Sequence, residues 1–202
     1  MQVKFINTTE VKYTNLKSVV SNDNLRPVMC GVYIDFKEQR LVATDAHVLI
    51  SYPIDITEND SELDGVIIPV DYFNRLRYMV ALPSKNKMLI DVEYILTDTY
   101  AEIHWCGEMI YRCKYIEGKY PNWNNENIMI NPTKYPKKPK QVGINAHILK
   151  KMLLGIPSAN PQTLIMETTS EKHAILFTTE NMDYDRPIHA IVMPTMLNSL
   201  NK

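Results

Sequence analysis

The sequence predicts an α+β protein built on antiparallel sheet, with its helices on one face of the sheet. Two observations carry this prediction. Each helical segment is followed by a run of three strand-like segments, and the order β-α-β-β-β occurs three times, about 65 residues apart. The three copies share this pattern but have little similarity in their residues.

The first copy is expected to open with a strand, followed by a helix in which Leu16, Val19 and Val20 have helical spacing, three strands and an acidic loop. These segments are 3–6, 10–20, 31–36, 40–45, 47–54 and 57–65. The second copy repeats the strand, the helix and the three strands at 65–69, 70–82, 87–96, 100–107 and 108–116, with a tight turn at Gly107.

The third copy has a strand at 140–145, a helix at 146–155 that Gly155 is expected to cap, and strands at 163–169, 173–179 and 189–194. Before the third copy, residues 118–140 contain four prolines, many asparagines and a cationic end, a composition typical of a connector. We therefore expect one complete domain over 1–127, a connector over 128–140 and half a domain over 141–202.

Composition excludes several classes of protein. The chain has 202 residues, 45% of them hydrophobic, and a net charge of −1, which is ordinary for a globular protein. No apolar run approaches the roughly 18 residues of a membrane span, and the polar N-terminus predicts no signal peptide. Cys30, Cys106 and Cys113 have no CxxC spacing, so reduced thiols in a cytoplasmic protein are expected.

Enzyme chemistry has two candidate sites. Asp45 and His47 lie two residues apart in "ATDAH", between two apolar strands, and form either an acid/base pair or a tight turn in which Asp45 binds backbone amides. His104, Cys106 and Cys113 are potential metal ligands, but no fourth ligand is evident. Because no nucleophile or nucleotide-binding motif accompanies them, we predict no catalytic residue, no metal and no cofactor.

The cations of the three predicted helices suggest a positive surface, since the helices are expected to share one face of the sheet. A positive surface attracts the phosphates of duplex DNA, although any surface helix carries a few lysines. The helix cations are Lys12, Lys17, Arg75, Arg77, Lys150 and Lys151.

Four segments, in the same order, resemble the bacterial sliding clamp family, the β subunit of the replicative DNA polymerase. They are "LRPVMCGVYIDF…RLVATDAHVLI", "GVIIPVDYFNRL", "YRCKYIEGKYPNWNNENI" and "HAIVMPTML". The resemblance implies the DNA-clamp fold of βαβββ units and a non-enzymatic replication protein. The first two copies of the pattern in this chain resemble the family's middle domain, and the third copy resembles the second half of the family's last domain.

In that family the "ATDGH" turn and the terminal "MP" tail meet and form a hydrophobic pocket for peptides of polymerases and other DNA-processing proteins. Here Ala46 replaces the family's glycine and Val48 its arginine, so an altered specificity or a lost pocket is also open. By position, the resemblance assigns to the pocket Met29, Thr44, Ala46, His47, Val48, Leu49, Pro121, Ile191, Val192, Met193, Pro194 and Met196.

The resemblance also implies an assembly, because the family's clamps are rings of twelve units and this chain is expected to have three. Four chains would supply twelve units; a monomer or a dimer that pairs half-domains remains open. The leading function is a tethering platform for duplex DNA and partner peptides. The alternatives are a clamp-fold interaction module that does not encircle DNA, and an enzyme.

Overall fold

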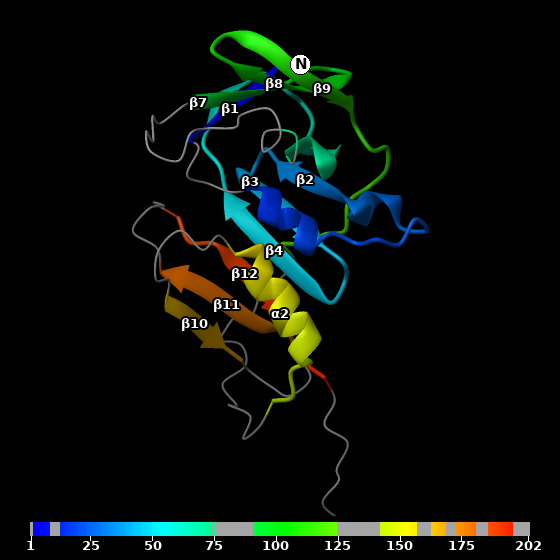
Figure 1. Cartoon of the computed structure of the whole chain (residues 1–202), viewed down its shortest axis with the longest axis vertical. Coiled ribbons are helices and arrows are strands. Elements are labelled where there is room, and N and C mark those ends of the chain that lie inside the picture. The colour runs from blue at the N-terminus through cyan, green and yellow to red at the C-terminus, as the bar shows by residue number, and fades with distance from the viewer. Residues whose placement is uncertain are drawn as a thin grey trace, which may run out of the picture.

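The computed structural model of the chain describes residues 2–8, 13–73, 75, 91–124, 142–156, 163–168, 173–180 and 186–195. These residues form two antiparallel sheets, and the helical segments at 13–18, at 71–73 and 75, and at 146–155 lie on one side of them (Figure 1). The strands are β1 Val3–Thr8, β2 Gly31–Asp35, β3 Arg40–Thr44, β4 Val48–Pro53, β5 Ile56–Asn59, β6 Gly65–Pro69, β7 Asp91–Leu96, β8 Tyr100–Trp105, β9 Glu108–Lys114, β10 Thr163–Glu167, β11 Ile175–Glu180 and β12 His189–Val192.

The first two copies of the pattern exchange their opening strands. In the five-stranded sheet, with order β5-β1-β7-β8-β9, β1 lies beside β7 of the second copy, with Val3 opposite Leu96. In the other sheet β6, which opens the second copy, pairs with β2 of the first. Each copy therefore completes the sheet of the other, and together they share one core.

The seven-stranded sheet has the order β10-β11-β12-β4-β3-β2-β6. It joins strands of the first copy of the pattern, which we call the first segment (2–64), to strands of the third copy, which we call the third segment (142–195). Strand β12 pairs with β4, so that Val192 lies opposite Val48 and Ile191 opposite Leu49. Figure 1 shows β10, β11 and β12 extending the sheet downward from β4. Residues about 140 apart in the sequence thus lie in adjacent strands of one sheet.

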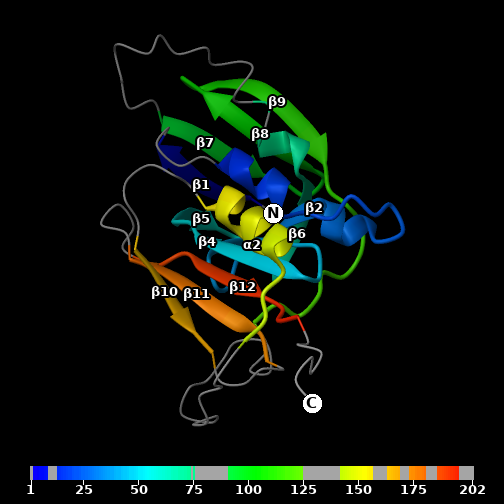
Figure 2. The same cartoon turned by 60° about the horizontal axis from the view of Figure 1, so that its bottom comes forward.

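The helices of the described residues are short. They are the 3-10 helices η1 Tyr13–Ser18 and η2 Pro27–Cys30, the α-helix α2 Ala146–Gly155, and a helical turn at 71–73 and 75. Helix α2 packs on η1 and on β4, and both views show η1 beside α2 (Figure 2). Leu16 of η1, Val19 directly after η1 and Met152 of α2 are fully buried in the shared core.

First-segment side chains hold the C-terminal end of α2. The Tyr52 hydroxyl donates a hydrogen bond to the carbonyl of Gly155, and Ser18 Oγ donates one to the carbonyl of Lys151 (3.4 Å). The Tyr52 bond satisfies a carbonyl that the helix end leaves without an intrahelical partner. A Cβ on Gly155 would lie 2.4 Å from Cδ1 of Ile50 and 2.6 Å from Cγ2 of Val19, so glycine permits this close approach of helix and sheet.

Several segments differ from the sequence-based expectation. The predicted acidic loop contains β5, an exposed edge strand paired with β1. The sequence did not indicate this strand, because a strand with polar residues on both faces has the composition of a loop. In the described part of the predicted helix at 10–20 there is a 3-10 helix, Tyr13–Ser18. Of the predicted strand at 140–145 the described residues 142–145 form only an isolated bridge, between Gly143 and Thr195.

The predicted cap of α2 is wrong by one residue, because Gly155 is still helical and the C-cap is Ile156 in an extended conformation. Glycine is needed there for the close packing described above. Gly107 has the expected positive φ of 82°. The connector 128–140 and most of the predicted helix 70–82 lie outside the described residues, so the domain boundaries stay a prediction.

His189 lies in the pairing of β12 with β4, which we call the β12–β4 seam, and it makes the stability of this seam depend on pH. Its Nδ1 is buried and has no hydrogen-bond partner among the described residues. Burial, reinforced by the positive charge of Arg40, lowers the pKa of His189 to about 4. Arg40 itself is held in place, since its guanidinium donates to the carbonyls of Ser51 and Pro187 (3.1–3.2 Å).

We expect the free energy of unfolding to decrease as the pH falls from about 6.5 towards 4, because the unfolded chain then binds a proton that the folded chain excludes. The expected loss is about 1–2 kcal/mol, measured by urea denaturation at pH 7 and pH 4.5. His189→Gln is the control and should flatten this part of the profile. Equal pH profiles for the two proteins would contradict the assignment.

Candidate functional site

The segment Thr44–Val48 is a tight turn between β3 and β4. The backbone amides of His47 and Val48 both donate to Asp45 Oδ1 (2.9 Å each), and Thr44 Oγ1 donates to the carbonyl of Val48 (2.8 Å). The amide of Ala46 donates in turn to Thr44 Oγ1 (3.1 Å). The polar residues that interrupt the apolar sequence therefore serve the turn, as Asp and Thr commonly do.

Ala46 adopts a left-handed backbone conformation, with φ of 76°. A residue with a Cβ is less stable there than glycine, by about 1–2 kcal/mol. The hydrogen bonds of Thr44 and Asp45 offset this cost and fix the turn. As a result Ala46 and His47 stand exposed at its tip.

The turn is also tied to α2. Lys151 Nζ donates to Asp45 Oδ2, in an ion pair whose side chains are only 23% and 16% exposed. Burial acts to raise the pKa of Asp45, but the hydrogen bonds from Lys151 and from the amides of Val48 and His47 outweigh it and hold the pKa below its ordinary value. Lys151 was predicted to face DNA; the structure assigns its charge to Asp45.

The C-terminal tail meets the turn directly. After β12, the amide of Met193 donates to the carbonyl of His47 (2.9 Å), and the amide of Thr195 donates to the carbonyl of Gly143 (2.8 Å). Met193 is 43% exposed and Pro194 is half-buried. The exposed residues Ala46, His47 and Met193 thus come together, and we call them the turn–tail site.

The predicted pocket residues on the two strands point to opposite faces of the sheet, because side chains alternate along a strand. Val48 and Val192 are buried in the main core under the helices. Leu49 and Ile191 are buried in a second cluster on the other face. By the same alternation Met193 follows Ile191, so this second face continues into the turn–tail site.

Aromatic residues cover the second face, and the sequence analysis did not assign them to the site. The ring of Tyr120 stacks on Tyr33 (5.0 Å between centroids) and its hydroxyl donates to the carbonyl of Val42 (3.2 Å). Trp123 Nε1 donates to Asp35 Oδ2 (2.9 Å). Pro121, half-buried, lies between these two buried aromatics in the chain, and the "YPNW" sequence was the available signal.

The remaining predicted pocket residues have different environments. Thr44 is buried within the turn and Met29 is half-buried in η2. Met196 lies outside the described residues.

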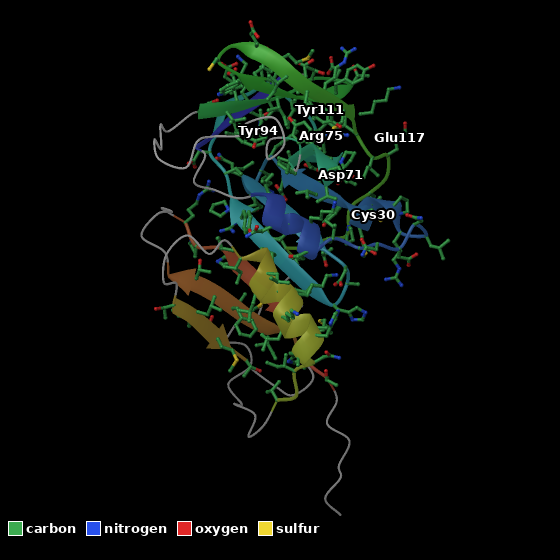
Figure 3. The ribbon with its side chains drawn as sticks, in the orientation of Figure 1. Cys30, Asp71, Arg75, Tyr94, Tyr111 and Glu117 are labelled. Atoms are coloured by element: carbon green, nitrogen blue, oxygen red, sulfur yellow. The ribbon has the colours of Figure 1, made fainter. Side chains whose placement is uncertain are left out.

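The helix cations have different environments. Lys17 pairs with Asp71 (3.2 Å), with both side chains more than 60% exposed, so its charge is offset on the surface. Arg75 lies over the ring of Tyr111, 5.3 Å from its centroid, and Figure 3 shows the two side chains together above Asp71. Lys150 is exposed on α2, while Lys12 and Arg77 lie outside the described residues.

The two candidate enzyme sites are not assembled as such. Asp45 is occupied by the turn and by Lys151, as above. His104 Nε2 lies 2.9 Å from Glu102 Oε2, and burial raises the pKa of the Cys113 thiol to about 12, which disfavours the thiolate that binds metals. In the described parts of the chain no three metal-ligating side chains gather, and no helix there is long and apolar enough to cross a membrane.

Two antiparallel sheets with exchanged opening strands, and helices on one side, define a protein of the sliding-clamp fold. Solved clamps confirm this class. The H. pylori beta clamp in complex with diflunisal (TM-score 0.65) and the Bartonella birtlesii clamp bound to griselimycin (TM-score 0.66) are similar to this chain at 14% and 15% identity. In each case 96% of this chain and 66% of that chain are covered.

The Pseudomonas aeruginosa sliding clamp is similar as well, with TM-score 0.64, 15% identity, and coverage of 96% of this chain and 67% of that one. The chain thus spans about two thirds of the length of these clamps. The family model for the DNA polymerase III beta subunit, central domain, matches residues 6–122. The chain belongs to this family, as the sequence resemblance predicted. Among curated proteins none matches.

Proposed function

We propose that the chain is a non-enzymatic, clamp-like platform of DNA replication in the cytoplasm. In this proposal it associates with duplex DNA through its helix surface and tethers DNA-processing proteins by short peptides at the turn–tail site. The observation that carries the proposal is the hydrogen bond from Met193 to His47, because it brings together two segments about 145 residues apart at an exposed, partly apolar position.

The chemistry of the turn–tail site supports a peptide as its ligand. Met193 offers a flexible, polarizable and exposed side chain, and its backbone is bonded to that of the exposed residue His47. Surfaces with such side chains adapt to Leu and Phe side chains of different partners. The backbone there is fixed by the turn, by β12 and by the Lys151–Asp45 ion pair, so little conformational entropy is lost on binding. Two similar clamps have organic ligands, diflunisal and griselimycin.

The peptide prediction can be tested with a fluorescent peptide that carries Leu and Phe. We expect Met193→Glu to weaken its binding at least about tenfold, because a carboxylate replaces an apolar contact. Fluorescence polarisation measures the affinity. The matched control is Met109→Glu on β9, since Met109 is similarly exposed (49%) but belongs to the other sheet. Equal losses for both variants, or no binding by the natural chain, would contradict the site.

The helix surface supports contact with DNA less strongly, since Lys17 and Lys151 have acidic partners. We propose that Lys150 and Arg75 contact phosphates, together with Lys12 and Arg77 of the six predicted residues. Such contacts carry no sequence information and release counterions, so binding should weaken with salt.

For duplex binding we expect Lys150→Ala to reduce the slope of log K against log salt concentration by about 1, as for the loss of one phosphate contact. The slope is obtained by titrating a labelled duplex at several salt concentrations. Lys37→Ala, at the turn between β2 and β3, is the control and should leave the slope unchanged. Peptide binding without salt-dependent DNA binding would favour the alternative, a clamp-fold interaction module that does not encircle DNA.

A further inference from the structure

We propose that two copies of this chain associate through their third segments (142–195), each lending residues 142–145 to the open edge of β10 in the other. This association goes beyond the proposed function and does not depend on DNA or peptides. It follows from a rule that the first two copies of the pattern obey.

The rule is the reciprocal exchange of opening strands. The first and second copies each contain three consecutive antiparallel strands, β2-β3-β4 and β7-β8-β9. In both, the outer edge of the first of these strands is covered by the opening strand of the other copy: β6 covers β2, and β1 covers β7. A copy of this kind is therefore completed by a partner copy.

The third segment lacks such a partner. Its three strands are β10-β11-β12, and β10 is the last strand of the seven-stranded sheet, with no described residue paired to its outer edge. Its sequence, TLIME, has three consecutive apolar residues, a pattern typical of strands that are covered on both faces. Instead Ile165 is 40% exposed and Met166 54% exposed.

The contrast with β2 shows what the partner supplies. Strand β2 holds the same place in the first copy, and four of its five residues are buried. In β10 four of the five residues are exposed and Leu164 is half-buried. An apolar strand edge of this kind, with no partner among the described residues, tends to pair with another strand.

The opening strand of the third segment is equally incomplete. Among residues 142–145 only Gly143 has a strand-like contact, the isolated bridge to Thr195, while Val142 and Ile144 are half-buried. These residues alternate apolar side chains next to the start of α2, as an opening strand does. They have no strand of the β2 or β7 type to cover within the described chain.

Helix α2 gives a second, independent indication. In the complete part of the chain, Leu16 of η1 and Tyr72 and Phe73 of the helical turn from the other copy are all buried in one core. Helix α2 packs on the first segment by Met152 and Gly155, but Leu153 and Leu154 stay 47% and 57% exposed. The third segment of another copy of the chain would bring its own α2 and sheet towards these leucines.

A second copy fits this surface because the exchange is self-complementary. If one chain lends 142–145 to the β10 of another, a two-fold axis places the second chain's 142–145 on the β10 of the first. Both open edges are then covered at once, and two half-domains form one complete domain. A second copy thus covers β10 and pairs 142–145 by the same contact.

The mass of the natural chain in solution, without DNA, tests the proposal. Light scattering after size exclusion should give twice the 23.4 kDa of the chain at micromolar concentration. Ile165→Lys should weaken the dimer at least about a hundredfold and give a monomer, because a charge enters the covered edge. Met166→Lys, on the opposite face of β10, is the second variant, and circular dichroism verifies folding of both.

The matched control is Met109→Lys on β9, an edge methionine of similar exposure in the other sheet, and it should stay dimeric. A monomeric natural chain at 100 µM would overturn the proposal. A dimer that survives both β10 variants, or one lost in Met109→Lys, would also overturn it. None of these results depends on whether the chain binds DNA or peptides.

Discussion

The pairing of β12 with β4 is the constraint on which the rest of the structure depends. It joins strands about 140 residues apart, and α2 packs beside it on η1, β4 and β12. Three features hold α2 there: the close approach that Gly155 permits, the Tyr52 hydrogen bond to the end of the helix, and the Lys151–Asp45 ion pair. Closing such a distant pair costs chain entropy, which this apolar burial and polar bonding offset.

The candidate site is a consequence of that pairing. The register that sets Val192 opposite Val48 also brings the amide of Met193 to the carbonyl of His47. Asp45 then has two functions, since one carboxylate oxygen holds the turn and the other holds α2. Stability of the seam and geometry of the turn–tail site are therefore coupled through a single side chain.

Much of the fold follows from sequence pattern, because long apolar segments such as β3, β4 and β11 are buried on both faces. The family and fold class were confirmed. Polar β5 could not be predicted, since only its pairing with β1 makes it a strand. For the site, the contact of Met193 with His47 was expected from the resemblance alone. The division of Leu49 and Val48 between two faces, and the cover provided by Tyr120, depend on tertiary packing that no local pattern encodes.

Hydrogen exchange of Gly155→Ala tests most directly whether the third segment and the first form one cooperative unit. The added methyl group collides with Ile50 and Val19, which should cost about 2 kcal/mol. We expect amides of β3, β4, β12 and α2 to lose protection together, by the same free energy. Loss confined to α2 and β10–β12, with β3 and β4 unchanged, would show that the third segment merely rests on an independent domain and would contradict this account.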